Sequence, residues 1–144
     1  MQSADTIRQL ALLDRERLEQ VMRDVAGFRA GGAAEKIASH LTEDLRLELA
    51  GHSPNFPYLG EYRGREAALF MLNRMRTDIE YQSFEMLALL VDHDQGFMRR
   101  RAQLRHRGTG KSGPVEIWDI YRFRDGRVCD LTIFLDLPAL MRLG

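Results

Sequence analysis

Two carboxylates stand in a segment of the chain that is otherwise rich in apolar and aromatic residues. Asp119 and Asp136 belong to segment 115–136, whose two halves flank Asp125-Gly126. An Asp-Gly pair favours a two-residue type I′ turn, so the segment predicts a β-hairpin. Because side chains alternate along a strand, counting outward from the turn places Asp119 and Asp136 on one face. Two carboxylates on such a face are suited to general acid–base chemistry.

The register of this hairpin divides its side chains between two faces. Counting from the turn pairs Arg124 with Arg127, Tyr121 with Asp130, Asp119 with Thr132 and Ile117 with Phe134. One face then holds Val115, Ile117, Asp119, Tyr121, Phe123, Val128, Asp130, Thr132, Phe134 and Asp136, and the other holds Glu116, Trp118, Ile120, Arg122, Cys129, Leu131, Ile133 and Leu135. Neither face is simply polar, so we expect both to be covered. A β-bulge would exchange the faces beyond it.

A second group of candidate residues lies on a long loop. Glycines and prolines interrupt segment 50–63, and neither a helix nor a central strand accommodates them. His52, Tyr58 and Tyr62 lie in or beside this loop, and imidazole and phenol groups can transfer protons or hold a carbonyl oxygen. A loop histidine is also commonly just solvated. Phe70 is a further candidate for ligand contact, although a place in the core or an interface would also explain it.

The remaining sequence predicts the elements that must position these residues. Apolar residues recur at helical spacing from Ile7 to a stop at Gly31-Gly32, then over 34–41, and again over 64–75. Strands are predicted at 45–49, 81–91 and 97–107, followed by the hairpin and by a short helix at 137–142. The order helix, helix, strand, loop, helix and four-strand antiparallel meander indicates a two-layer α+β domain.

Composition limits the class of protein. The 144 residues suffice for one domain, and the 21 acidic and 21 basic residues argue against nucleic acid or an anionic membrane as partner. On a strand, the basic run 99–107 would alternate between faces and form cross-strand ion pairs. Cys129 is the single cysteine and no Cys/His spacing resembles a metal site, so we expect a reducing, cytoplasmic setting and no metal or other cofactor. The charged first thirty residues fit neither a signal peptide nor a membrane helix.

Three motifs connect this order of elements with a known superfamily. They are Tyr62-Arg-Gly-Arg-Glu-Ala67 at the third helix, Phe123-Arg-Asp-Gly-Arg-Val128 at the hairpin and Phe134-Leu-Asp136 at the end of the last strand. With them the chain resembles the nuclear-transport-factor-2-like (NTF2-like) superfamily. It resembles more closely the SnoaL-like branch, whose relatives include polyketide cyclases, ketosteroid isomerase and limonene-epoxide hydrolase. The resemblance covers residues 1–144 as a single SnoaL-like domain.

The resemblance implies a fold and an assembly. The expected fold is α+β, with a cone-shaped curved antiparallel sheet wrapped around three helices and an apolar pocket between them. Members of the superfamily often form homodimers, so we expect a dimer through the convex face of the sheet. On the predicted register, the face that carries Leu131, Ile133 and Leu135 suits this contact, and the face with the carboxylates suits the pocket wall.

The resemblance also implies roles for individual residues. Asp136 matches an acidic residue in the catalytic Asp-Arg-Asp set of the epoxide hydrolases, and Arg101 matches the arginine of that set. Gln103 stands where the second carboxylate is expected. Because glutamine cannot act as the base that activates water, this departure counts against epoxide hydrolysis, although Gln103 can still hydrogen-bond a ligand. Asp119 lies on the strand that contributes an acidic residue in ketosteroid isomerase and the cyclases.

Both carboxylates also have structural interpretations. Asp136 precedes Leu137-Pro138, a sequence typical of a helix N-cap. Asp119 could pair with a neighbouring arginine such as Arg100 or Arg101.

Two classes of function remain after this weighing. The first is an isomerase, cyclase or dehydratase that acts without a cofactor on a small apolar carbonyl compound, using Asp136, Asp119 and Arg101. Its ligand-binding residues would be His52, Tyr58, Tyr62, Phe70, Gln103, Tyr121 and Phe134. The second is a non-catalytic ligand-binding or dimerisation module. A cavity shared by the two aspartates would favour the enzyme, and ion pairing outside such a cavity would favour the module.

Overall fold

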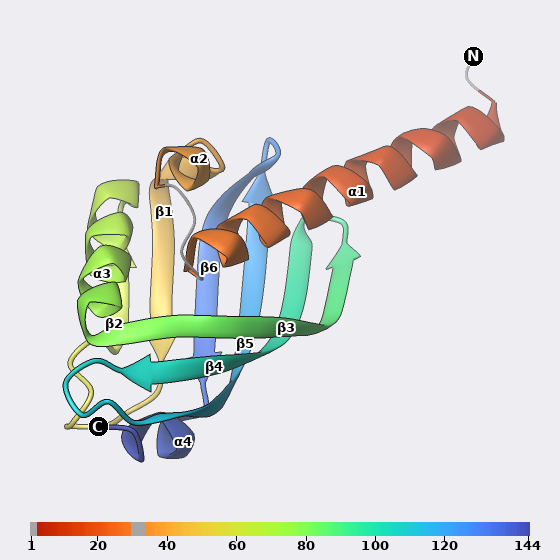
Figure 1. The fold of residues 1–144 in the computed structure, drawn as a ribbon. Helices are drawn as coiled ribbons and strands as arrows, with labels where there is room; N and C mark the ends of the chain where they lie inside the picture. The colour runs from red at the N-terminus through yellow and green to blue at the C-terminus, as the bar shows by residue number, and fades with distance from the viewer. Residues whose placement is uncertain (1–2, 30–33) are drawn as a thin grey trace.

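The computed structural model describes residues 3–29 and 34–144, and the predicted stop at Gly31-Gly32 lies outside them. The described residues form a curved six-stranded sheet in the order β2-β1-β6-β5-β4-β3 (Figure 1). The helices are α1 (Ala4–Arg29), α2 (Ala34–Ala38), α3 (Arg65–Asp78) and α4 (Leu137–Met141). The strands are β1 (Leu41–Ala50), β2 (Gly60–Arg63), β3 (Ile79–Asp92), β4 (Gln95–His106), β5 (Ser112–Arg124) and β6 (Arg127–Leu135). The predicted α+β class is confirmed.

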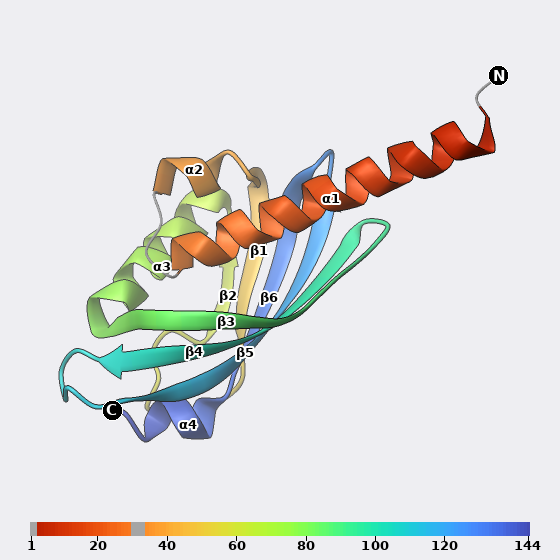
Figure 2. The ribbon, with the colours of Figure 1, turned by 45° about the vertical axis from the view of Figure 1, so that its right-hand side comes forward.

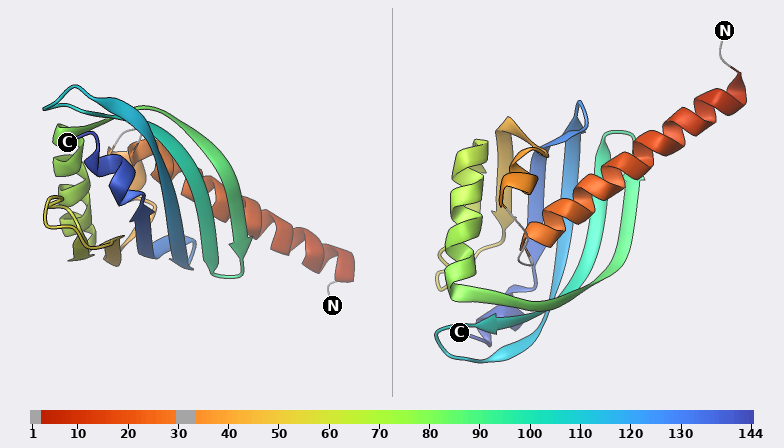
Figure 3. Two further views of the ribbon diagram at one scale, coloured as in Figure 1. Left: turned by 90° about the horizontal axis from the view of Figure 1, so that it is seen from below. Right: turned by 45° about the horizontal axis from the view of Figure 1, so that its top comes forward.

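The sheet curves around α1, α2 and α3, which lie on its concave side (Figures 2 and 3). Neighbouring strands from β3 to β6 pair antiparallel, so the predicted meander is confirmed. The register of β3 against β4 shifts twice, and such bulges increase the bend of a sheet. β2 falls in the segment that was predicted to be loop, and it pairs with β1. β1 in turn pairs parallel with β6, so β1 and β2 extend the sheet beyond the meander.

The start of β1 differs from the prediction. Helical spacing over 34–41 suggested that the second helix includes Leu41, but α2 ends at Ala38 and β1 begins at Leu41. Leu41 pairs with Val128 of β6 and is buried, as are Leu45 and Leu47 further along β1. Pairing with a distant strand therefore outweighs the local helical pattern.

The hairpin has the predicted turn but not the predicted register. Positive φ angles at Asp125 (53°) and Gly126 (77°) fit the type I′ turn. Arg124 pairs with Arg127 and Phe123 with Val128, but a bulge at Cys129 then makes Arg122 pair with Asp130. Beyond the bulge every pair is displaced by one residue.

This displacement exchanges the two faces of β6 and corrects several expectations. Asp119 pairs with Ile133, Tyr121 with Leu131 and Ile117 with Leu135. Leu131 and Ile133 are buried in the core, so the prediction that they contact a second subunit is wrong. Phe134 turns to the convex face and is 44% exposed, so it does not line the interior.

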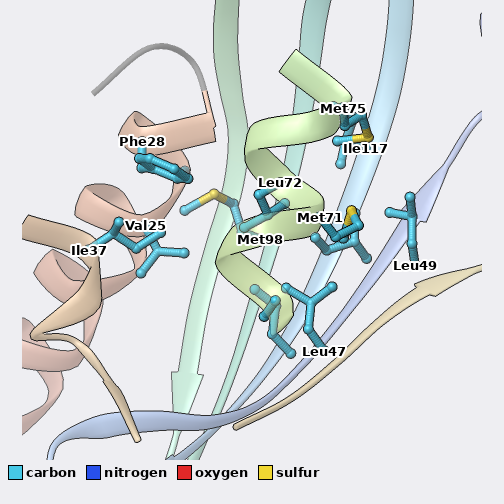
Figure 4. Close-up of a cluster of buried hydrophobic side chains, with 14 of the residues drawn as sticks. Val25, Phe28, Ile37, Leu47, Leu49, Met71, Leu72, Met75, Met98 and Ile117 are labelled. Atoms are coloured by element: carbon cyan, nitrogen blue, oxygen red, sulfur yellow. The ribbon is translucent and has the colours of Figure 1, made fainter. Parts of the chain in front are cut away.

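The core fills the space between the helices and the concave face. Figure 4 shows Val25 and Phe28 of α1, Ile37 of α2, Leu47 and Leu49 of β1, Met71, Leu72 and Met75 of α3, Met98 of β4 and Ile117 of β5. The methionines are flexible and polarizable, so this part of the core can repack more easily than one built from branched residues.

α1 extends beyond the sheet at its N-terminal end (Figure 2). Ile7, Leu10 and Leu13 of this extension are exposed. No helix within residues 3–29 and 34–144 combines the length and apolar composition that crossing a membrane requires. The cytoplasmic location stays a prediction.

Candidate functional site

The concave face carries a buried ion pair between neighbouring strands. The Nε of Arg100 on β4 donates a hydrogen bond to Oδ2 of Asp119 on β5 over 3.0 Å. Both side chains are 0% exposed. Of the two structural interpretations of Asp119, the structure therefore shows pairing with Arg100. Charged groups at this depth are stable only when they are paired, because each loses its hydration on burial.

The alternation of β4 explains why Arg100 points inward. Gly96, Met98, Ala102 and Leu104 share the inward face with Arg100, and all are buried. Arg101 and Gln103 project to the opposite face, where Arg101 is exposed and Gln103 half-buried. The arginine of the interior is therefore Arg100, one residue before the position matched to the epoxide hydrolases. The sequence contained a sign of this orientation, because Arg100 occupies the same alternating positions as the apolar residues Met98, Ala102 and Leu104.

The pair leaves part of the guanidinium unsatisfied. Among the described residues, Nη1 and Nη2 of Arg100 are buried and have no hydrogen-bond partner. A buried donor without an acceptor costs about 1–3 kcal/mol, and more when it is charged. An oxygen acceptor at these nitrogens would recover this energy. The two parallel N–H groups on this edge of the guanidinium suit one oxygen or a pair of oxygens.

The edge strand β3 leaves this region close to solvent. Phe84 pairs with Ala102 and Met86 pairs with Arg100, so both side chains project to the inward face. Phe84 is 37% and Met86 38% exposed, whereas their partners on β4 are 0% exposed. The Phe84 ring centroid lies 5.7 Å from Cζ of Arg100. β3, with Phe84 and Met86, is thus the single strand that lies between Arg100 on β4 and solvent at this edge of the sheet.

Asp136 lies away from this pair. Its Oδ1 accepts a hydrogen bond from the backbone N–H of Ala139 over 3.2 Å, which caps α4, with Pro138 in the first turn. Asp136 is exposed and Asp119 is fully buried. The structure therefore does not bring the two carboxylates together, because the bulge at Cys129 reverses the faces that the predicted register assigned.

The other predicted ligand residues separate into inner and outer groups. Tyr121 is fully buried and stacks on Phe123, with ring centroids 6.1 Å apart. Tyr62 donates a hydrogen bond to the backbone oxygen of Tyr58 over 2.7 Å, and burial raises its pKa. His52 is exposed, and Phe70 is exposed on α3.

Tyr58 belongs to a different part of the molecule. It lines a cavity at the end of the sheet where β3 begins and β4 ends, together with Asp78 and His106. Asp78 and His106 were missed by the sequence interpretation, since only the fold places the loop, α3 and β4 together. No group of three or more metal-ligating side chains gathers within the described residues.

The curved sheet with helices on its concave side is the NTF2-like fold, and solved structures share it. An NTF2-like protein from Burkholderia xenovorans LB400 has a TM-score of 0.74 at 16% identity, over 90% of this chain and 96% of that chain. An M. tuberculosis LEH-like epoxide hydrolase has 0.70 at 14% identity, over 89% of each chain. Bal32a from a soil-derived mobile gene cassette has 0.74 at 20% identity, over 90% and 98%. Identities this low show the fold alone.

The sequence itself defines the family. The profile of the SnoaL-like domain matches residues 21–131, so the chain belongs to the SnoaL-like domain family. A comparison with curated proteins found no match. Membership of this family supports the interpretation of the chain as a small-molecule-binding protein.

Proposed function

We propose that this protein binds a small, largely apolar carbonyl compound inside the cone and catalyses cofactor-independent acid–base chemistry on it, of the isomerase, cyclase or dehydratase type. The observation that carries the proposal is the edge of Arg100 formed by Nη1 and Nη2, which is buried and without an acceptor among the described residues. Two N–H groups directed at one carbonyl oxygen polarise the carbonyl and stabilise negative charge on its oxygen.

In this proposal the neighbouring Asp119 carboxylate is the base. It takes a proton from the carbon next to the carbonyl, the electron pair of the broken C–H bond moves into the enolate, and the Arg100 N–H groups hold the enolate oxygen. Return of the proton to carbon completes the cycle. Asp136 and Arg101 take no part, because both are exposed away from the pair.

The charge of the pair restricts the ligand. Asp119 already compensates the charge of Arg100 in a site that is 0% exposed. A neutral oxygen acceptor therefore fits better than a carboxylate, which would leave a net negative charge in the interior. The ligand would enter past Phe84 and Met86, and the flexible methionine side chains next to Ile117 (Figure 4) would move aside.

The test of binding uses acetophenone, with ethylbenzene and benzoate as matched probes that lack the carbonyl or carry a charge. We expect acetophenone to shift the Nε–H resonance of Arg100 in nitrogen-edited NMR and ethylbenzene to leave it unchanged. Met86→Trp should weaken acetophenone binding at least about tenfold by narrowing the entrance. Leu90→Trp is the control, because Leu90 is exposed on the outward face of the same strand.

Several outcomes would contradict this proposal. They are equal binding of acetophenone and ethylbenzene, tighter binding of benzoate, or equal effects of the two tryptophan variants.

The alternative is a module that binds its ligand without turnover, and the paired state of Asp119 favours it. One measurement distinguishes the two functions, namely the exchange of the acetophenone methyl protons for deuterium in heavy water. The proposed enzyme accelerates this exchange in the wild type and loses the acceleration in Met86→Trp. Binding without any acceleration would establish the module.

We also propose that the chain forms a homodimer through the convex face. Trp118, Ile120 and Phe134 are each 40–45% exposed on this face, and Trp118 pairs with Phe134 across β5 and β6. Phe97 packs against Trp118, with ring centroids 5.3 Å apart. A contiguous apolar patch of this kind is typical of a protein interface.

A further inference from the structure

A cavity of about 270 Å³ opens at one end of the sheet, separate from the interior pair. The loop between β1 and β2, the end of α3, the end of β4 and α4 gather there (Figures 1 and 3). Phe56, Ile79 and Leu140 form apolar walls, and Tyr58, Asp78 and His106 supply polar groups.

The cavity is distant from Arg100. His106 lies six residues after Arg100 on β4, which corresponds to about 20 Å in a strand. Ala102 and Leu104 lie buried between them on the same face, so the two regions are not continuous. A ligand of this cavity is thus independent of the function proposed above.

Among the side chains that line the cavity, Asp78 carries a formal negative charge and Tyr58 is neutral. The Tyr58 hydroxyl donates a hydrogen bond to the Asp78 carboxylate. Burial raises the pKa of Tyr58, and the hydrogen bond and the charge of Asp78 raise it further. The charge of Arg74 lowers the pKa of Tyr58, but Arg74 does not line the cavity.

A backbone hydrogen bond orients the ring of His106. Its Nδ1 accepts a hydrogen bond from the backbone N–H of Thr109 over 3.1 Å. A ring nitrogen that accepts has no proton, so the proton of the neutral ring is on Nε2. Nε2 lies beside Gly144, which also lines the cavity. The lining side chains therefore combine one negative charge with one directed N–H group.

Two aromatic rings form a corner of the same cavity. The centroids of Phe56 and Tyr58 are 5.4 Å apart, and the ring planes meet at 70°. A ligand in such a corner can contact the negative face of one ring and the edge of the other. A cation near such a face is stabilised electrostatically, most of all when it is weakly hydrated.

We infer that this cavity binds a small methylated ammonium ion, with Phe56 and Tyr58 around the methyl groups and Asp78 supplying the counter-charge. The Asp78 carboxylate already accepts a hydrogen bond from Tyr58. It can therefore attract a cation by its negative charge more readily than it can accept a further hydrogen bond. A quaternary ammonium group requires charge and aromatic contact but no hydrogen-bond acceptor. A hydroxyl oxygen on a short chain can accept the Nε2–H bond of His106.

The test compares choline with 3,3-dimethylbutan-1-ol, which has the same shape with carbon in place of the charged nitrogen. Binding to the full chain is followed by NMR through the ring signals of Phe56, Tyr58 and His106. We expect choline to bind roughly tenfold more tightly than the alcohol. Asp78→Asn should remove this difference and leave the affinity for the alcohol unchanged.

Three control variants make the result specific. Tyr58→Phe keeps the ring and should retain choline binding. Asp92→Asn removes an exposed carboxylate at the other end of β3 and should have no effect. Met86→Trp should leave choline binding intact, so failure here and failure of the interior site are distinguishable. Equal binding of the two probes, no binding of choline, or unchanged preference in Asp78→Asn would overturn the inference.

Discussion

At the scale of single residues, the unusual feature is the fully buried ion pair of Arg100 and Asp119 in an apolar core. Breaking a buried pair on one side leaves the other charge unpaired, whereas replacing both partners with apolar residues does not. Asp119→Asn should therefore lower the free energy of unfolding by about 3–5 kcal/mol. The double variant Arg100→Met/Asp119→Leu should lose much less, as measured by urea denaturation. Equal losses in the single and double variants would show that the pair is not coupled.

Asp136 is a second residue whose role can be separated into structure and chemistry. Its carboxylate caps α4 through Ala139, and loss of a cap costs about 0.5–2 kcal/mol. Asp136→Ala should lower stability by this amount, and Asp136→Asn should keep most of it because asparagine caps equally well. Thermal melts measure both. Neither variant should alter deuterium exchange of acetophenone, and a loss of exchange in folded Asp136→Asn would return Asp136 to the mechanism.

At the scale of elements, the bulge at Cys129 decides which residues of β6 face the core. Without Cys129, the strand would alternate regularly, with Val128 inward and Asp130 outward. Leu131 and Ile133 would then still point inward. Deletion of Cys129 should therefore leave the fold intact, as judged by circular dichroism and thermal melting. Deletion of Thr132 is the matched control, since it moves Ile133 to the outward face and should unfold the protein. Similar losses in both deletions would contradict this account of the register.

At the scale of the whole molecule, we expect substitutions on the convex face to disrupt the proposed dimer and substitutions on the helical layer to leave it intact. Trp118→Lys should convert the proposed dimer into a monomer, because it places a charge in the apolar patch with Phe134. Phe70→Lys changes a still more exposed aromatic residue, on α3, and should leave the dimer intact. Sedimentation analysis distinguishes these states. A wild-type chain that stays monomeric at high concentration would remove the dimer from the proposal.

The sequence by itself determined the elements whose signals are local. The helical spacing of α1 and α3, the Asp-Gly turn and the order of the meander needed only neighbouring residues, and the family motifs fixed the curved α+β fold. The position of Asp136 before Leu137-Pro138 likewise predicted the helix cap that the structure contains.

Only the tertiary structure decided what depends on distant partners. A bulge has no local signature in Arg127–Leu135, yet it exchanged the faces of β6, turned Phe134 outward and separated Asp136 from Asp119. Arg100 rather than Arg101 faces inward because packing in the core, with α1 against β4, sets which face of this strand is buried. Tyr58, Asp78 and His106 meet only because loop, helix and strand end at the same edge of the cone. Side-chain period and helix capping are properties of short segments, whereas register and cavity lining are properties of the whole curved sheet.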